Sequence, residues 1–232
     1  MYLESRRDII ADSAARHGVP AAWLGAVLYN EMLGTEDCVL RSWLPGENAA
    51  AQTTRQVLLG LHFLTLKQLQ YQTKTLLALL GADPTLGPAG IRVSVGREIR
   101  VDEPVVGGVY VADGWLERPS MVLDLNDPDM AVEYLAANLR RGQDRLSPLD
   151  RGDWAASARW HNTGVVYDSE IVRLPDWEKG SRYIQRVEGY LPQITAVLGL
   201  DGVDDMEATA RPPRGWQKSD TVLLRQGQHL SP

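Results

Sequence analysis

The chain has 232 residues, of which 44% are hydrophobic and 23% are charged, a balance that indicates a folded globular protein and excludes an intrinsically disordered one. Its net charge of -6 argues against broad nucleic-acid binding, which usually requires a basic face. With one cysteine, Cys38, no intrachain disulfide framework is possible.

The N-terminal residues carry charges where a secretory signal needs an apolar run, so we expect no cleavable signal peptide. The most apolar stretch, residues 57–66, is shorter than the roughly 20 residues that cross a bilayer. We therefore expect a soluble protein without membrane insertion. If it acts outside its own cell, we expect it to leave by a non-classical route.

The first part of the chain predicts helices. Residues 3–17 form the first expected helix, and Gly18-Val19-Pro20 separates it from a second that starts at Pro20 and runs to about Leu33. The dense leucines of residues 48–81 predict one long helix or two. No heptad register is sustained there, so we expect these leucines to pack in the core and not in a coiled coil.

From Thr85 to Asp113 the pattern predicts a small antiparallel sheet or hairpin, because the residues are β-branched or alternate in polarity. The expected strands lie in residues 91–95, 98–101 and 109–111. Helical signals then resume, and three helices are expected to begin at Asp127-Pro128, at the capping Asp153 and at the capping Ser181.

The second expected helix carries the residue that suits catalysis best. Leu24, Val27 and Leu28 follow the spacing of one helical face, and Glu31 is the next position on that face. A carboxylate on a core-facing stripe is partly removed from water, which favours its protonated form. Glycosidic cleavage needs such an acid, because the leaving oxygen must receive a proton. The spacing also fits a glutamate that turns outward to water.

Short polar and glycine-containing segments then follow Glu31 in a particular order. They are Tyr29-Asn30-Glu31 itself, Thr85-Leu86-Gly87-Pro88-Ala89-Gly90-Ile91, Leu125-Asn126-Asp127-Pro128 with Tyr134-Leu135, Ala158-Arg159-Trp160-His161-Asn162-Thr163-Gly164, and Ser181-Arg182-Tyr183-Ile184-Gln185-Arg186-Val187. Over roughly residues 5–198 the chain resembles the lysozyme-like superfamily, specifically the soluble lytic transglycosylase and goose-type lysozyme group. In that group the first segment holds the catalytic glutamate, the second borders the sugar cleft, and a tyrosine of the last reaches toward the glutamate.

The resemblance implies a mainly α (α+β) fold, with a lysozyme-like helical domain and a small antiparallel β element beside a cleft. The implied catalytic domain covers residues 1–202, with a leucine-rich helical insertion at about 40–82, and residues 203–232 form an extended C-terminal tail. The implied activity is that of a muramidase. Glu31 would protonate the oxygen of the MurNAc-GlcNAc β-1,4 bond and then act as base.

The resemblance also implies substrate-binding roles for Tyr183, Asn162, His161, Gly87 and Ile91. Each has a simpler structural alternative. Tyr183 also fits an ordinary core tyrosine, Asn162 fits a helix C-cap before a glycine, and Gly87 fits a chain turn. The tryptophans Trp154 and Trp160 are candidates for sugar stacking or for buried packing.

Three positions depart from the family pattern. The family's glutamine in the second segment is Gly90 here, its tyrosine in the fourth is His161, and the serine after its glutamate is Met32. The first two changes favour a second hypothesis, a catalytically silent glycan-binding or structural module with the same fold. A third hypothesis is a chitinase-like or chitosanase-like glycosidase, because those folds share the helix-borne glutamate.

A second carboxylate would separate two mechanisms. A hydrolase needs a group that activates water, whereas a lytic transglycosylase uses the sugar's own 6-hydroxyl and one carboxylate. The candidates are Glu36, Asp37 and Asp83, but a loop or helix-end carboxylate is the alternative for each. The one-carboxylate mechanism is favoured because the resemblance marks no second acid.

The remaining function classes have little support in the sequence. The four histidines are scattered without metal-ligand spacing, and phosphate-binding and serine-hydrolase motifs are missing, so we expect no metal and no cofactor. The expected partner is the peptidoglycan glycan strand. An antibacterial effector or phage component that works on the cell wall would also meet secretion machinery or an immunity protein.

Overall fold

The computed structural model describes residues 3–34, 54, 57, 68–102, 105, 107–109, 114–167 and 177–200. Cys38, the candidate carboxylates Glu36 and Asp37, most of the leucine-rich stretch, and the expected tail at 203–232 lie outside the described residues.

The described part of the chain is mainly helical with one small antiparallel sheet, as the sequence predicts. Its eight α-helices are α1 (Arg7–His17), α2 (Ala21–Tyr29), α5 (Gln68–Leu79), α6 (Val93–Asp102), α7 (Glu117–Asn126), α8 (Pro128–Asp144), α9 (Trp154–Thr163) and α11 (Trp177–Leu198). A 3-10 turn, η1 (Glu4–Arg6), precedes α1, and a π-helical turn, η2 (Asn30–Gly34), continues α2. Strands β1 (Thr85–Leu86) and β2 (Ile91–Arg92) pair with Thr85 opposite Arg92.

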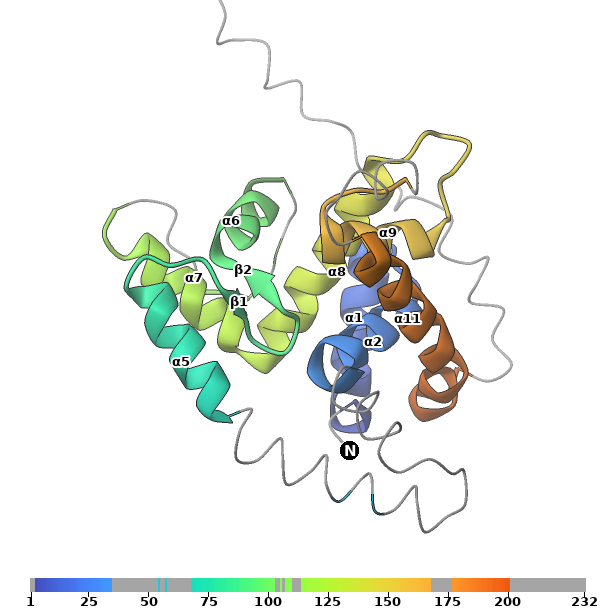
Figure 1. The fold of residues 1–232 in the computed structure, drawn as a ribbon, viewed down its shortest axis with the longest axis horizontal. Coiled ribbons are helices and arrows are strands. Elements are labelled where there is room, and N and C mark those ends of the chain that lie inside the picture. Colours follow the sequence, from blue (N-terminus) through green and yellow to red (C-terminus); the bar gives the residue numbers. More distant parts are fainter. Residues whose placement is uncertain are drawn as a thin grey trace, which may run out of the picture.

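Helix α8 lies between two groups of elements (Figure 1). On one side α1, α2, α9 and α11 pack together, and on the other side are α5, α6, α7 and the β1–β2 hairpin. Because α8 contacts members of both groups, most of its side chains are buried, including Tyr134 and Leu135. The helix therefore holds the two groups together, and several of its polar residues, including Glu133, Asn138 and Arg141, are buried.

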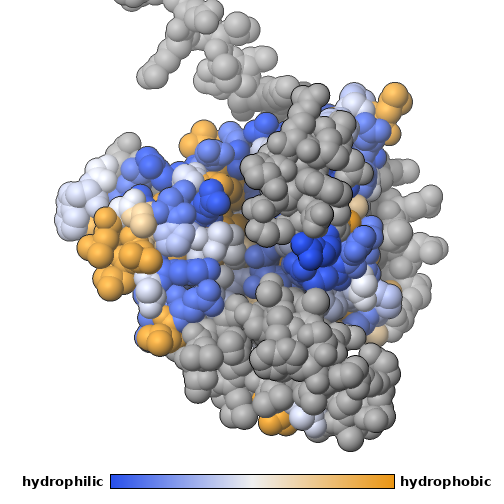
Figure 2. Space-filling view, in the orientation of Figure 1, coloured by the Kyte–Doolittle hydropathy of each residue, from blue (hydrophilic) through white to orange (hydrophobic). Residues whose placement is uncertain are grey.

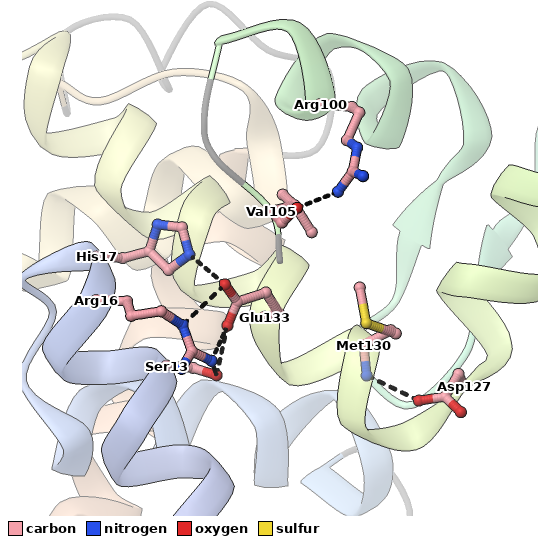
Figure 3. Close-up of polar contacts among 8 residues, drawn as sticks. All are labelled: Ser13, Arg16, His17, Arg100, Val105, Asp127, Met130 and Glu133. Carbon is pink, nitrogen blue, oxygen red and sulfur yellow. Dashed lines mark hydrogen bonds and ion pairs between the residues drawn. The ribbon is translucent and has the colours of Figure 1, made fainter. Parts of the chain in front are cut away.

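The helix starts expected at two aspartates are confirmed. The Asp127 carboxylate accepts hydrogen bonds from the backbone N–H groups of Asp129 and Met130, both 2.9 Å, and so caps α8 (Figure 3). The Asp153 carboxylate accepts from Ala156 N at 3.0 Å and caps α9. By contrast, α11 begins at Trp177, so the start expected at Ser181 is wrong by about one turn.

The strands expected at residues 93–101 are also wrong, because this segment is helix α6. Only Ile91 and Arg92 of the first expected strand pair in the hairpin. Val93, Gly96 and Ile99 are buried at a spacing of three, the helical face that packs against α7 and α8. Packing against these helices therefore overrides the β propensity of the branched residues.

The leucines of α5 do not pack in the core as expected. Among the large apolar side chains of this helix and its end, several are 45–75% exposed: Leu69, Leu76, Leu77, Leu79 and Leu80. Apolar side chains form an orange patch at the lower left of Figure 2, on the side of the molecule where Figure 1 places α5. Ala78 is the residue of this helix that is buried against the core.

A buried ion cluster joins α1 to α8 (Figure 3). The Glu133 carboxylate accepts from Ser13 Oγ at 2.7 Å and from Arg16 Nη2 at 2.6 Å on one oxygen, and lies 3.0 Å from His17 Nε2 on the other. Burial raises the pKa of Glu133, but the hydrogen bonds from His17, Arg16 and Ser13 outweigh it and lower the pKa to about 2. Glu133 therefore stays charged, and its hydrogen bonds connect α8 to α1.

Candidate active site

A cleft of about 300 Å³ opens between the two groups of elements. Both groups of elements contribute to its lining, which includes Glu31, residues 90–92 of the hairpin, Glu98 of α6, Asn138 and Arg141 of α8, and residues 160–164 at the end of α9. The fold thus brings together the first, second and fourth segments of the family resemblance, which are far apart in the sequence.

Glu31 lies in the π-helical turn that follows α2. Leu24, Val27 and Leu28 are fully buried, so the apolar face predicted from their spacing does face the core. The chain leaves the α-helical path at Asn30, and π turns of this kind often occur at functional sites. The Glu31 side chain is 22% exposed, which means that it is partly desolvated yet reachable from the cleft.

Tyr183 of α11 holds one oxygen of this carboxylate. Its hydroxyl donates to Glu31 Oε1 at 2.7 Å, although the two residues are 152 positions apart. Burial, the charge of Glu31 and the hydrogen bond to it together raise the pKa of Tyr183 well above its ordinary value, against smaller opposite effects of Asn30 and Arg186. Tyr183 therefore stays protonated, acting as a donor to Glu31 and not as a base. It does not line the cleft itself.

His161 faces the same oxygen from α9. Its Nε2 lies 3.6 Å from Glu31 Oε1, and its side chain is 3% exposed. The other ring nitrogen, Nδ1, lies 3.0 Å from the Asn138 amide nitrogen of α8. The Asn138 carbonyl oxygen is buried and finds no hydrogen-bond partner within the described part of the chain. The imidazole thus lies between Asn138 of α8 and the carboxylate, with Nδ1 at hydrogen-bond distance from Asn138.

Two glycines shape the chain beside Glu31. Gly90 has a φ of +63°, and a Cβ there would collide with Glu31 Oε2. Gly87 has a φ of +62°, and a Cβ there would collide with the Leu125 carbonyl at the end of α7. Gly87 therefore lets the hairpin lie against α7 and does not line the cleft, whereas Gly90 lets the hairpin lie directly against the carboxylate.

The other residues proposed from the sequence are divided between the cleft and the core. Ile91, Asn162 and Trp160 line the cleft, and Asn162 is exposed in the last turn of α9. The helix ends at Gly164, whose N–H donates to the Trp160 carbonyl at 2.8 Å. One face of the Trp160 ring is covered by the Arg145 guanidinium, 4.2 Å from the ring centroid.

Trp154, the other tryptophan candidate, packs partly buried against the core and is not among the residues that line this cleft.

The second carboxylate of the cleft is Glu98, which the sequence interpretation did not propose and which it placed in an expected strand. Arg141 Nη2 donates to Glu98 Oε2 at 3.1 Å and lies 3.1 Å from Asp102 Oδ2. The Glu98 side chain is 62% exposed, while Arg141 is 6% exposed. Asp83 lies elsewhere and accepts hydrogen bonds from Ser94, at 3.1 Å from its backbone nitrogen and 2.5 Å from its hydroxyl.

Asn138 and Arg141 were also missed, although a signal for Asn138 exists. Ala131, Leu135, Asn138 and Gly142 follow the spacing of one helical face and are all buried, so Asn138 is a polar residue on an apolar stripe. The same feature had marked Glu31. Nothing in the spacing of Arg141 sets it apart from the other charged residues of α8.

Neither a metal-ligating cluster nor a helix suited to crossing a membrane occurs within the described residues. Comparisons with known protein families, with curated proteins and with solved structures gave no match for this chain.

Proposed function

We propose that this chain is a lysozyme-like glycosidase that cleaves the MurNAc-GlcNAc β-1,4 bond of peptidoglycan, with Glu31 as general acid and base. The observation that carries the proposal is the 2.7 Å hydrogen bond between Tyr183 and Glu31 at the cleft. It joins the glutamate and the tyrosine of the resemblance, which come from opposite ends of the domain.

The two oxygens of Glu31 have different surroundings, which supports different tasks for them in the proposed reaction. In the described part of the chain, Oε1 receives the Tyr183 hydroxyl and faces His161, whereas Oε2 lies against Gly90, where no side chain stands in the way. Oε2 is then the oxygen that hands its proton to the glycosidic oxygen as the C–O bond breaks. General acid catalysis of this kind contributes roughly a hundredfold to ten-thousandfold.

For the step that follows bond cleavage, we favour the mechanism of a lytic transglycosylase. As the cation-like sugar forms, its own 6-hydroxyl attacks C1 and Glu31 takes the proton of that hydroxyl, so one carboxylate serves twice. Glu98, the second carboxylate of the cleft, is held by Arg141 and is mostly exposed. Because a Glu98 oxygen is engaged by the Arg141 guanidinium, the contacts of Glu98 support the one-carboxylate route.

The proposed substrate lies outside the cytoplasm, and the proposed role is that of an antibacterial effector or a phage component. An effector of this kind would need a secretion machinery, and an immunity or inhibitor protein that protects its producer. The proposed reaction uses neither a metal nor a cofactor.

The test is digestion of purified peptidoglycan by the wild type and by Glu31→Gln, with the soluble fragments analysed by mass spectrometry. Glu117→Gln is the matched control, because Glu117 pairs with Arg97 at the surface of α7 and does not line the cleft. We expect wild type and control to release fragments lighter by one water, and Glu31→Gln to release none. Wall binding without release by a folded wild type would replace this proposal with a silent glycan-binding module.

A further inference from the structure

The contacts of His161 raise the question of which ring nitrogen carries the proton. A neutral imidazole has one N–H donor and one acceptor, and the partner of each nitrogen decides between the two forms. Here Nδ1 faces the Asn138 amide group at 3.0 Å, and Nε2 faces Glu31 Oε1 at 3.6 Å. The second partner is informative because a carboxylate can only accept.

With Asn138 turned so that its amide nitrogen faces Nδ1, the amide donates and Nδ1 accepts. The single proton then lies on Nε2, directed at Glu31 Oε1. If the Asn138 amide were turned over, its carbonyl oxygen would accept a hydrogen bond from Nδ1–H, and the neutral ring would direct the lone pair of Nε2 at the carboxylate. That arrangement is repulsive, so the neutral ring favours the first form.

We propose that Asn138 is a positioning residue that holds neutral His161 with its proton on Nε2, so that His161 and Tyr183 both direct donors at Glu31 Oε1. This inference rests on the proposed function for its catalytic meaning, but the location of the proton is a property of the folded protein alone. Two neutral donors on Oε1 stabilise the carboxylate formed when Oε2 gives up its proton, and they leave Oε2 as the reacting oxygen.

The same contacts give the Asn138 amide a second orientation beside a protonated His161. If His161 gains a proton, both ring nitrogens become donors, and the buried Asn138 carbonyl oxygen, which lacks a described partner, can accept from Nδ1 after the amide turns. The charged groups that share the cleft with His161 are Glu31, Glu98 of α6 with its partner Arg141 of α8, and Arg92 of the hairpin.

Nitrogen-15 NMR of the histidine side chains tests the proposal, because long-range couplings distinguish the two neutral forms. The spectra are recorded at a pH where the rings are neutral, and His161→Gln identifies the His161 signals. We expect the proton on Nε2 in the wild type. In Asn138→Asp the new carboxylate accepts from Nδ1, so the proton should move to Nδ1 in the neutral ring. Asn126→Asp is the matched control, since the Asn126 amide donates to the Val122 carbonyl away from the cleft.

A wild-type ring with its proton on Nδ1 overturns the proposal, and this result does not depend on whether any variant folds. It is also independent of the wall assay, so failure of the proposed function and failure of this inference are separate outcomes. If wild type releases wall fragments, Asn138→Asp should lower kcat about tenfold and leave KM within about twofold, as expected for lost transition-state stabilisation. If Asn138→Asp instead raised KM by the same factor by which it lowered kcat, a positioning role would be contradicted.

Discussion

Two carboxylates of this protein lie in contrasting regions, Glu133 between α1 and α8 and Glu31 at the cleft. Glu133 is buried and surrounded by donors on both oxygens, two of them from the Arg16 guanidinium, and its pKa is about 2. Glu31 is 22% exposed, has one short hydrogen bond from a neutral hydroxyl on Oε1, and has Oε2 against Gly90, which has no side chain.

The difference fits a structural role for Glu133 and the proposed catalytic role for Glu31. A carboxylate that must hold helices together gains from cations and several donors, because they keep it charged at every ordinary pH. A carboxylate that must exchange a proton needs partners that orient it without fixing its charge. The largest expected effects of mutation therefore concern stability at Glu133 and activity at Glu31.

Replacing Glu133 should have the largest effect on stability. Glu133→Gln keeps the shape of the side chain but leaves Arg16 and His17 without their negative partner, so we expect the free energy of unfolding to fall by about 3–5 kcal/mol. Asp144→Asn is the control on the same helix. Its ion pair with Arg140 is half-exposed, so its loss should cost no more than about 0.5 kcal/mol. Urea unfolding of both variants measures the difference, and equal losses would contradict it.

The same cluster predicts an acid-sensitive stability. The pKa of Glu133 is lowered from 4.5 to about 2 in the folded state, so its contribution is present above about pH 4.5 and is lost as the pH falls toward 2. The shift corresponds to about 3 kcal/mol. Urea unfolding at stepwise lower pH should show the wild type approaching Glu133→Gln in stability. A constant gap between the two proteins down to pH 2 would argue against the role of Glu133.

Replacing Gly90 tests whether Glu31 Oε2 is the reacting oxygen. Gly90→Ala places a methyl group against Oε2 in addition to straining a positive φ, so we expect Glu31 to be displaced and wall cleavage to fall about a hundredfold. Gly81→Ala is the matched control, because Gly81 also has a positive φ, +104°, but no atom lies within 4 Å of its added Cβ. Both variants should lose about 1 kcal/mol of stability from backbone strain. An active Gly90→Ala protein would show that Oε2 is not the reacting oxygen.

The helical parts of the fold were predictable because their signals are local. The capping aspartates Asp127 and Asp153 and the apolar face of α2 each depend on residues within one or two turns, and the structure agrees at all three. Segment 93–101 failed for a physical reason. Its branched residues fit a strand locally, and only contact with α7 and α8 makes it a helix.

The candidate site was predictable only in part, for a similar reason. Glu31 combines a helical spacing with a motif, and a polar residue on a buried stripe would have marked Asn138. Glu98 lines the cleft from helix α6, a segment that the sequence predicted to be a strand. Its pairing with Arg141 links positions 43 residues apart. In the sequence, Gly90 is a departure from the family pattern. Its closeness to Glu31 depends on how the hairpin packs, which the sequence does not give.

Tyr183 donates a hydrogen bond to the proposed catalytic carboxylate, and its loss should have a moderate effect on activity. Tyr183→Phe removes the donor to Glu31 Oε1 and keeps the packed ring, so we expect cleavage to fall about tenfold with little loss of stability. Tyr167→Phe removes a hydroxyl that accepts from Ser147 N and does not line the cleft, so it should leave cleavage unchanged. Initial rates of fragment release and thermal melts provide the two measurements. A drop in melting temperature alone would make Tyr183 a packing residue.

Glu98 should show the smallest effect, and it separates the two mechanisms. If the 6-hydroxyl of the sugar is the nucleophile, Glu98→Gln removes only an exposed partner of Arg141, and cleavage should change by less than about threefold. The products should still be lighter by one water. If Glu98 activates water, the wild type instead releases ordinary reducing ends, and the variant loses most of its activity. Mass spectra of the fragments from both proteins therefore decide whether the cleft works with one carboxylate, as its ion pairing indicates, or with two.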